Sequence, residues 1–172
     1  MWYAPTFSIQ IFSSTMILVD DKDALYQQLH SPDPQTREEA TQRLWQIYFG
    51  AAGPEAEIRL LQAEQAMESS QFEAAEILLN DLILDFPSFA EAWNRRATLY
   101  YLTKKYTASL ADCEATTRLE PQHFGAWHGT GLNYLALHKY ADAARAFRRA
   151  LEIQPFAEAN QKLLGECLAK LN

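Results

Sequence analysis

The chain has 172 residues, a mass of 19.6 kDa and a formal net charge of −7 at neutral pH. Its 48% hydrophobic and 22% charged residues are typical of a soluble globular domain, and six glycines and seven prolines are too few for a collagen-like or low-complexity chain. The acidic balance argues against nucleic acid as a partner, because phosphate backbones bind to broad basic surfaces.

The charge is unevenly distributed along the chain. Residues 1–89 contain 4 basic and 14 acidic side chains, whereas residues 90–172 contain 11 basic and 8 acidic ones. Such an asymmetry can steer a charged partner toward the protein. It also leaves head-to-tail self-association of the two halves open.

Residues 1–20 are predicted to form an N-terminal arm, loosely attached to the rest of the chain. They contain no lysine or arginine and therefore lack the basic region with which a secretory signal begins. Their apolar stretch, Phe7 to Val19, is interrupted by polar residues and is shorter than the ~20 apolar residues that span a bilayer. Translation from Met16 and a weak membrane or partner anchor are the alternatives to this interpretation.

Residues 21–53 are predicted to form two helices that cap the N-terminal end of the fold. Before the second of these helices, Asp33 and Pro34 supply an N-cap residue and a proline at the first helical position. Apolar residues recur at helical spacing over residues 35–49, and glycines end the pattern. A degenerate repeat is the alternative interpretation of this pair.

One fixed period runs through the remainder of the chain, in three units of equal length: residues 56–89, 90–123 and 124–157. Each unit contains two amphipathic helical stretches joined by a short turn. One helix pair cannot cover its own apolar face, so successive pairs are expected to stack around a continuous core. Residues 158–172 repeat the start of a unit and are predicted to form a closing helix. The residues that carry the period are prolines, aromatic residues and small residues: Pro87, Pro121 and Pro155; Phe72, Tyr106 and Tyr140; Ala63, Ala97 and Gly131; Ala75, Ser109 and Ala143.

The third unit resembles the tetratricopeptide repeat (TPR). The resemblance is carried by Trp127-x2-Thr130-Gly131-x2-Tyr134, by Ala143-x3-Phe147-x2-Ala150 and by Pro155. The second unit departs from the family pattern at Cys113 and Thr116, and the first departs at Arg59, Ala66 and Leu79. The resemblance covers about residues 56–155. It implies an all-α fold, an α-α superhelix or TPR solenoid of three helix-turn-helix repeats, with an N-terminal helical cap and a C-terminal capping helix.

No motif in the sequence predicts catalysis. The G-x-S-x-G and P-loop patterns are absent, and the four histidines lack the spacing of a metal site. We therefore expect a non-enzymatic protein with no catalytic residues, no metal and no cofactor. Cys113 and Cys167 form no C-x-x-C motif, and we expect them to be buried thiols in a reducing, cytoplasmic compartment.

The resemblance implies that a partner binds to the concave face of the superhelix. In the family this face is lined by positions 2, 5, 9, 12 and 13 of each first helix, which share one stripe. The stripe is acidic in the first unit and apolar in the third, so the predicted partner is a protein or peptide with basic and apolar residues. The predicted partner-binding residues are Glu57, Leu60, Glu64, Met67, Glu91, Asn94, Thr98, Tyr101, His128, Leu132 and Leu135.

Certain family members hold the acidic C-terminal tails of heat-shock chaperones with a clamp of lysine, asparagine and arginine side chains. The corresponding residues of this chain do not match, and the carboxylate of Glu64 would repel such a tail. We therefore predict a protein-interaction scaffold that does not bind chaperone tails, and an assembly factor or a co-chaperone is the role that we expect. A self-assembling structural protein and a secretion-type chaperone are the alternatives. The residues at the clamp positions are Leu60, Glu64, Arg95, Gly125 and Gly129.

Overall fold

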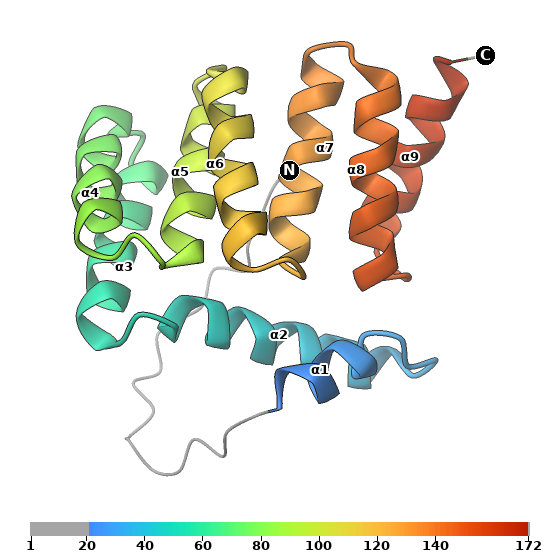
Figure 1. The fold of residues 1–172 in the computed structure, drawn as a ribbon, viewed down its shortest axis with the longest axis horizontal. Coiled ribbons are helices and arrows are strands. Elements are labelled where there is room, and N and C mark those ends of the chain that lie inside the picture. The colour runs from blue at the N-terminus through green and yellow to red at the C-terminus, as the bar shows by residue number, and fades with distance from the viewer. Residues whose placement is uncertain (1–20, 172) are drawn as a thin grey trace.

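The computed structural model describes residues 21–171, which form nine α-helices and no strand. Figure 1 shows α3 to α9 standing side by side in one row, with α1 and α2 lying across their lower ends. This arrangement confirms the predicted all-α solenoid. The arm predicted at residues 1–20, with its alternatives, lies outside the described residues. The helices are α1 (Lys22–Gln28), α2 (Pro34–Gly50), α3 (Pro54–Glu68), α4 (Phe72–Asp85), α5 (Ala90–Leu102), α6 (Tyr106–Leu119), α7 (Phe124–Ala136), α8 (Tyr140–Ile153) and α9 (Glu158–Ala169).

The turn inside each repeat has the same backbone geometry. Ser70, Lys104 and His138 stand at the same position of successive repeats and all have a positive φ, of 58°, 61° and 58°. In the first repeat the amide after this residue, that of Gln71, donates to the carbonyl of Ala66 over 2.8 Å, the bond that closes a Schellman motif. The period in the sequence therefore sets the turns as well as the helices.

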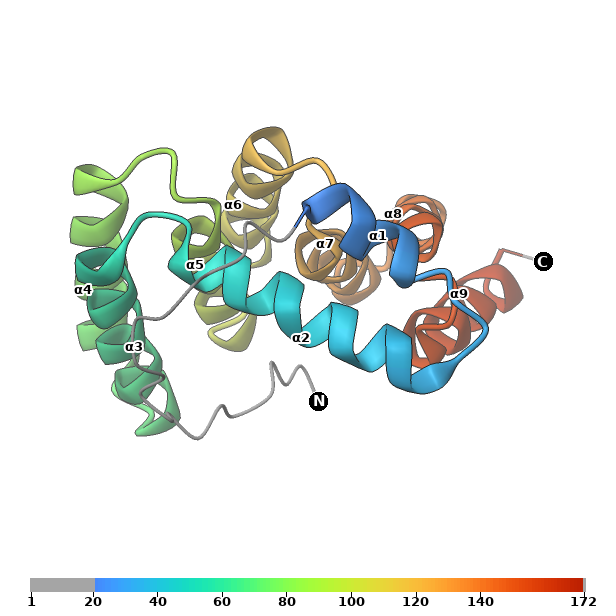
Figure 2. The ribbon, with the colours of Figure 1, turned by 90° about the horizontal axis from the view of Figure 1, so that it is seen from below.

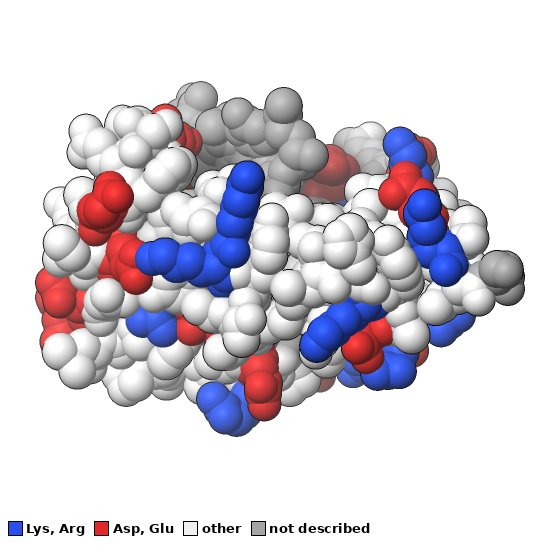
Figure 3. Space-filling view, turned by 90° about the horizontal axis from the view of Figure 1, so that it is seen from above, with Lys and Arg blue, Asp and Glu red and all other residues white. Residues whose placement is uncertain are grey.

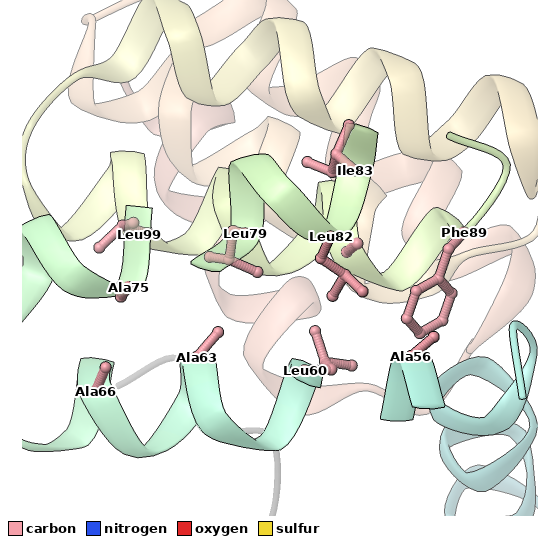
Figure 4. Packing of buried hydrophobic residues seen from close by; sticks show 11 residues of the cluster. Ala56, Leu60, Ala63, Ala66, Ala75, Leu79, Leu82, Ile83, Phe89 and Leu99 are labelled. Carbon is pink, nitrogen blue, oxygen red and sulfur yellow. The ribbon is translucent and has the colours of Figure 1, made fainter. Parts of the chain in front are cut away.

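Small residues allow the two helices of each repeat to approach closely. Ala63 of α3 and Ala75 of α4 are both 0% exposed, and Leu79 is packed in the same cluster. Figure 4 shows Leu60 and Ala63 of α3 facing Leu79 and Leu82 of α4. In the third repeat an added Cβ at Gly131 would overlap the ring of Phe147, so only glycine fits this crossing without displacing that ring.

The α1–α2 pair does not lie where a cap stacked on the first repeat would lie. Figure 2 shows α2 passing beneath α5 and α7 toward α9. Its Leu44 and Tyr48 are buried in one cluster with Phe124 of α7 and Ile153 of α8. The pair thus runs along the lower edge of the solenoid, because its apolar residues pack on the start of the third repeat.

No helix of residues 21–171 is both long and apolar enough to cross a membrane. The longest, α2, has 17 residues and begins as predicted at Pro34. The side chain of Asp33 accepts a hydrogen bond from the Thr36 amide over 2.9 Å and caps this helix.

Candidate partner-binding groove

The predicted groove residues lie on the first helix of each repeat, α3, α5 and α7, and α2 divides the surface that they form. At the N-terminal ends of α5 and α7 the surface is covered by aromatic residues of α2. A Cβ added to Gly125 of α7, for example, would lie 2.8 Å from Cη2 of Trp45. Toward the opposite ends of α3 and α5, Glu68 and Leu102 are exposed.

Four charged or polar side chains form a cluster between α2 and the helices of the repeats. We call it the buried ionic cluster: Glu64, Glu91, Arg95 and His123. The guanidinium Nε of Arg95 lies 2.8 Å from a carboxylate oxygen of Glu91 and 3.0 Å from one of Glu64. Glu91 and His123 are 0% exposed. A buried charge is tolerated only when it is paired, so these residues hold one another in place.

The tautomer of His123 follows from its two contacts. Its Nδ1 accepts a hydrogen bond from the Ala126 amide over 3.1 Å, so the ring proton is on Nε2. Nε2 therefore donates to the Glu91 carboxylate, 2.8 Å away. Burial raises the pKa of Glu91, but the charge of Arg95 and the hydrogen bond from His123 outweigh burial and hold that pKa below its ordinary value.

Aromatic side chains of α2 cover the buried ionic cluster. The ring of Tyr48 stacks on the imidazole of His123 with 4.3 Å between their centres, and Trp45 meets the same imidazole edge-on at 5.7 Å. The Phe49 ring lies 4.7 Å from the guanidinium of Arg95, at cation–π distance. Burial raises the pKa of Tyr48, and its hydroxyl is hydrogen-bonded to that of Tyr26 over 2.8 Å.

Four predicted binding residues are therefore not on an open surface. Leu60 and Glu91 are 0% exposed, Asn94 is 2% exposed and Thr98 is 6% exposed. Leu60 belongs to the core of the first repeat, and Asn94 donates to Glu91 over 3.2 Å. The expectation of an open groove along these residues is not met: Leu60 is part of a repeat core, and Glu91 is enclosed in the buried ionic cluster that the aromatic side chains of α2 cover.

The other predicted binding residues differ in their exposure to solvent. Glu57 is exposed, and Glu64 is half-buried beside Arg95. His128 is half-buried, with Nδ1 2.5 Å from the side-chain oxygen of Asn160, and burial lowers its pKa.

The part of the concave face away from α2 lies toward the C-terminal ends of α3, α5 and α7. Its side chains are half-buried apolar or aromatic residues, except for Leu102, which is 50% exposed. The exposed carboxylate of Glu68 lies at its α3 end. Figure 3 shows acidic side chains gathered at the end of the molecule formed by α3 and α4. We call this surface the upper groove: Met67, Tyr101, Leu102, Leu132 and Leu135.

Sequence reasoning missed the residues that occupy the lower part of the groove. Arg95 was placed at a clamp position but not paired with Glu91, although a spacing of four residues on one helix is a signal for such a pair. Trp45, Tyr48 and Phe49 share one side of α2 at helical spacing. That pattern indicates a buried face, but it does not reveal which surface the face meets.

No group of three or more His, Cys, Asp and Glu side chains in residues 21–171 has the geometry to hold a metal ion. Within the same range, both cysteines are free and buried. Burial raises the pKa of Cys113 to about 12, which keeps this thiol protonated.

Two sequence profiles of the tetratricopeptide repeat match this chain, one over residues 60–124 and the other over residues 124–157. A TPR repeat-containing protein of Rhizobium etli is 33% identical over 109 residues, which are 63% of this chain and 53% of that protein. Human superkiller complex protein 3 is 33% identical over 64 residues, 37% of this chain and 4% of that protein. The chain thus spans about half the length of the first relative and a small part of the second.

Solved structures show the same fold. The first TPR domain of RPAP3 (Spaghetti), bound to the HSP90 peptide SRMEEVD, has a TM-score of 0.66 and 20% identity, and the match covers 67% of this chain and 92% of that domain. The Sgt2 TPR domain of Aspergillus fumigatus has a TM-score of 0.65 and 21% identity, with 69% and 80% covered. At these identities the likeness establishes the fold.

Proposed function

Because the chain belongs to the tetratricopeptide repeat family, we propose that it is a non-enzymatic protein-interaction module whose upper groove binds one segment of a partner protein. The observation that carries this proposal is the division of the concave face by α2. The lower part is filled by the chain's own aromatic residues, whereas the upper groove presents Met67, Tyr101 and Leu102 beside the carboxylate of Glu68.

The chemistry of the upper groove indicates the kind of segment that fits it. Apolar side chains bind apolar anchors of a helix or an extended peptide, and an acidic rim favours lysine or arginine next to them. A partner segment with basic and large apolar residues is therefore part of the proposal. Structural neighbours that hold peptides support a role as an assembly factor or co-chaperone that recognises a segment other than an acidic chaperone tail. The free, buried Cys113 and Cys167 support a cytoplasmic location.

A displayed peptide library selected on the immobilised full chain tests this function. We expect the enriched peptides to carry basic and large apolar residues. Leu102→Asp and Glu68→Lys should each weaken their binding by about tenfold, which corresponds to ~1.4 kcal/mol. Both residues are exposed, so neither change disturbs the core.

Leu119→Asp, at an exposed leucine at the end of α6, is the matched control and should leave binding unchanged. Glu91 is unsuitable for this test, because its side chain is buried and its replacement would affect folding. Selected peptides that bind equally well to the Leu102→Asp and Glu68→Lys chains would show that the upper groove is not the site.

A further inference from the structure

Helix α9 packs as the first helix of a repeat packs, although no helix within residues 21–171 follows it. Gln161 stands one full period after Trp127 of α7, at the equivalent position. Its Nε2 donates to the carbonyl of Pro155 over 2.8 Å, just as the indole of Trp127 donates to the carbonyl of Pro121 over 2.9 Å. The start of α9 is therefore held in the same register as the start of α7.

One side of α9 is packed against α8. Cys167 is 0% exposed and Asn160 is 5% exposed. Leu163 and Leu164 are half-buried against the cluster that contains Phe147. This side accounts for the attachment of α9 to the third repeat.

The other side of α9 is open at Gly165. Gly165 is the counterpart of Gly131 in the preceding repeat, whose equivalent face is filled by the ring of Phe147. A Cβ added to Gly165 meets nothing within 4 Å. Leu168, three residues after Gly165 on the same helix, is 37% exposed. The exposed residues of α9 also include Glu158, Gln161, Lys162 and Glu166, so polar side chains border the gap beside Gly165.

We propose that the open face of α9, formed by Gly165 and Leu168, binds an amphipathic helix of another protein in the way that α7 binds α8. The interface between α7 and α8 shows what such a helix must carry. Ala143 and, four residues later, Phe147 are 0% exposed and belong to one core cluster. Because Gly165 leaves the same space as Gly131, the docked helix presents a small residue and an aromatic residue at this spacing.

The charge of the neighbouring helix adds a third requirement. Glu114 of α6 and Arg145 of α8 line one hollow of about 480 Å³ between these helices. Arg148 is the counterpart of Glu114 one repeat later and is exposed on α8. A helix docked on α9 therefore places the residue equivalent to Arg145 near Arg148, where Asp or Glu is favourable.

These requirements define the partner helix as one with the pattern small-x-acidic-x-aromatic. A second copy of this chain fits less well than a foreign helix. Its α8 has the small and aromatic residues, but Arg145 stands at the acidic position and would meet Arg148 with like charge.

Labelled synthetic peptides with the sequence of residues 139–154 serve as probes in fluorescence anisotropy titrations with the full chain. We expect the Arg145→Glu peptide to bind saturably and about tenfold more tightly than the unmodified peptide. Adding Phe147→Ala to the Arg145→Glu peptide should weaken binding by about tenfold or more.

Gly165→Leu in the full chain should abolish this binding without lowering the melting temperature, because the new side chain enters open space. Leu84→Asp, at a leucine of α4 that is 79% exposed, is the matched control and should leave peptide binding unchanged. The Leu102→Asp change of the upper groove should also leave it unchanged, so the two sites fail or succeed separately.

Two results would overturn the proposal. One is the absence of saturable binding, or binding that persists in the Gly165→Leu chain. The other is self-association in sedimentation that disappears in the Gly165→Leu chain, because the open face would then be covered by a second copy of this protein.

Discussion

His123 Nε2 lies 2.8 Å from the carboxylate of Glu91, and both side chains are 0% exposed. Glu91 belongs to α5, and His123 is the N-cap residue of α7, so the contact joins the second repeat to the start of the third. Tyr48 of α2 stacks on the same imidazole. The lower part of the groove is thus a structural joint between three segments rather than a binding surface.

Replacing Glu91 by Gln should lower the free energy of unfolding by about 3 kcal/mol at neutral pH. Arg95 and His123 would stay buried without the negative carboxylate that both of them contact. Burial raises the pKa of Glu91, but Arg95 and His123 together lower it below its value of 4.5 in an unfolded chain. A carboxyl with a lowered pKa in the folded state stabilises the protein above 4.5, and this contribution is lost as the pH falls through the folded value.

Urea unfolding of the wild type and the Glu91→Gln chain, followed from neutral pH to below pH 4.5, checks this prediction. The difference in unfolding free energy between the two chains should shrink as the pH falls. A difference that stays constant over this range would contradict the assigned pKa direction.

Gly131→Ala and Gly165→Ala should have opposite effects, although the two glycines occupy equivalent positions. A Cβ at Gly131 overlaps the buried ring of Phe147, and overpacking of a core costs about 1–3 kcal/mol. A Cβ at Gly165 meets nothing within 4 Å, so the change should stabilise α9 by up to about 1 kcal/mol through helix propensity. Thermal unfolding of both variants measures the contrast. A lower melting temperature for Gly165→Ala would mean that its face is already covered.

The repeats could be predicted from the sequence because their signals are local. The short turn predicted inside each unit coincides with the positive-φ residues, such as His138 between the end of α7 at Ala136 and the start of α8 at Tyr140. Each signal lies within a single repeat, where periodicity and helix-ending geometry determine the same bounds.

The course of α2 could not be predicted in this way. Its stripe, which includes Leu44 and Tyr48, correctly indicated an amphipathic helix. The surface that the stripe meets includes His123 and Phe124, which lie two repeats further along the chain, as the Tyr48 hydroxyl contact with the Gln122 carbonyl shows. Periodicity within a helix reveals its buried face but not the surface that this face meets. The sequence therefore predicted an open groove at the residues that α2 covers.

Trp45→Ala should detach α2 from the solenoid edge more than it destabilises the repeats. The ring centres of Trp45 and Phe124 are 5.1 Å apart, and the indole of Trp45 also covers Gly125. The loss of this indole therefore leaves a cavity between α2 and α7. Because Trp45 is only half-buried, we expect a cost of about 2–3 kcal/mol, near the lower end for such truncations. Amide hydrogen exchange should speed up across α2, while α8 keeps its protection. Gln46→Ala, at an exposed neighbour, is the control, and equal acceleration in α8 would show that α2 and the third repeat unfold together.

The peptide SRMEEVD, which the first TPR domain of RPAP3 binds, should not bind to this chain. The position that would need a lysine is taken by Leu60, which is buried, and Glu64 presents a carboxylate where the peptide's own carboxylates would lie. Arg95 is close enough to attract an acidic tail, but Glu64 and Glu91 already lie 3.0 Å and 2.8 Å from its Nε.

Isothermal titration of SRMEEVD into the full chain, with the RPAP3 domain as the positive control, measures this directly. We expect no heat of binding for the full chain and saturable binding for the control. Glu64→Gln removes the repelling carboxylate without supplying a lysine, so it should leave the chain unable to bind. Saturable binding to the unmodified chain would show that a tail can be held without the clamp residues, and would direct the search for partners back to acidic C-termini.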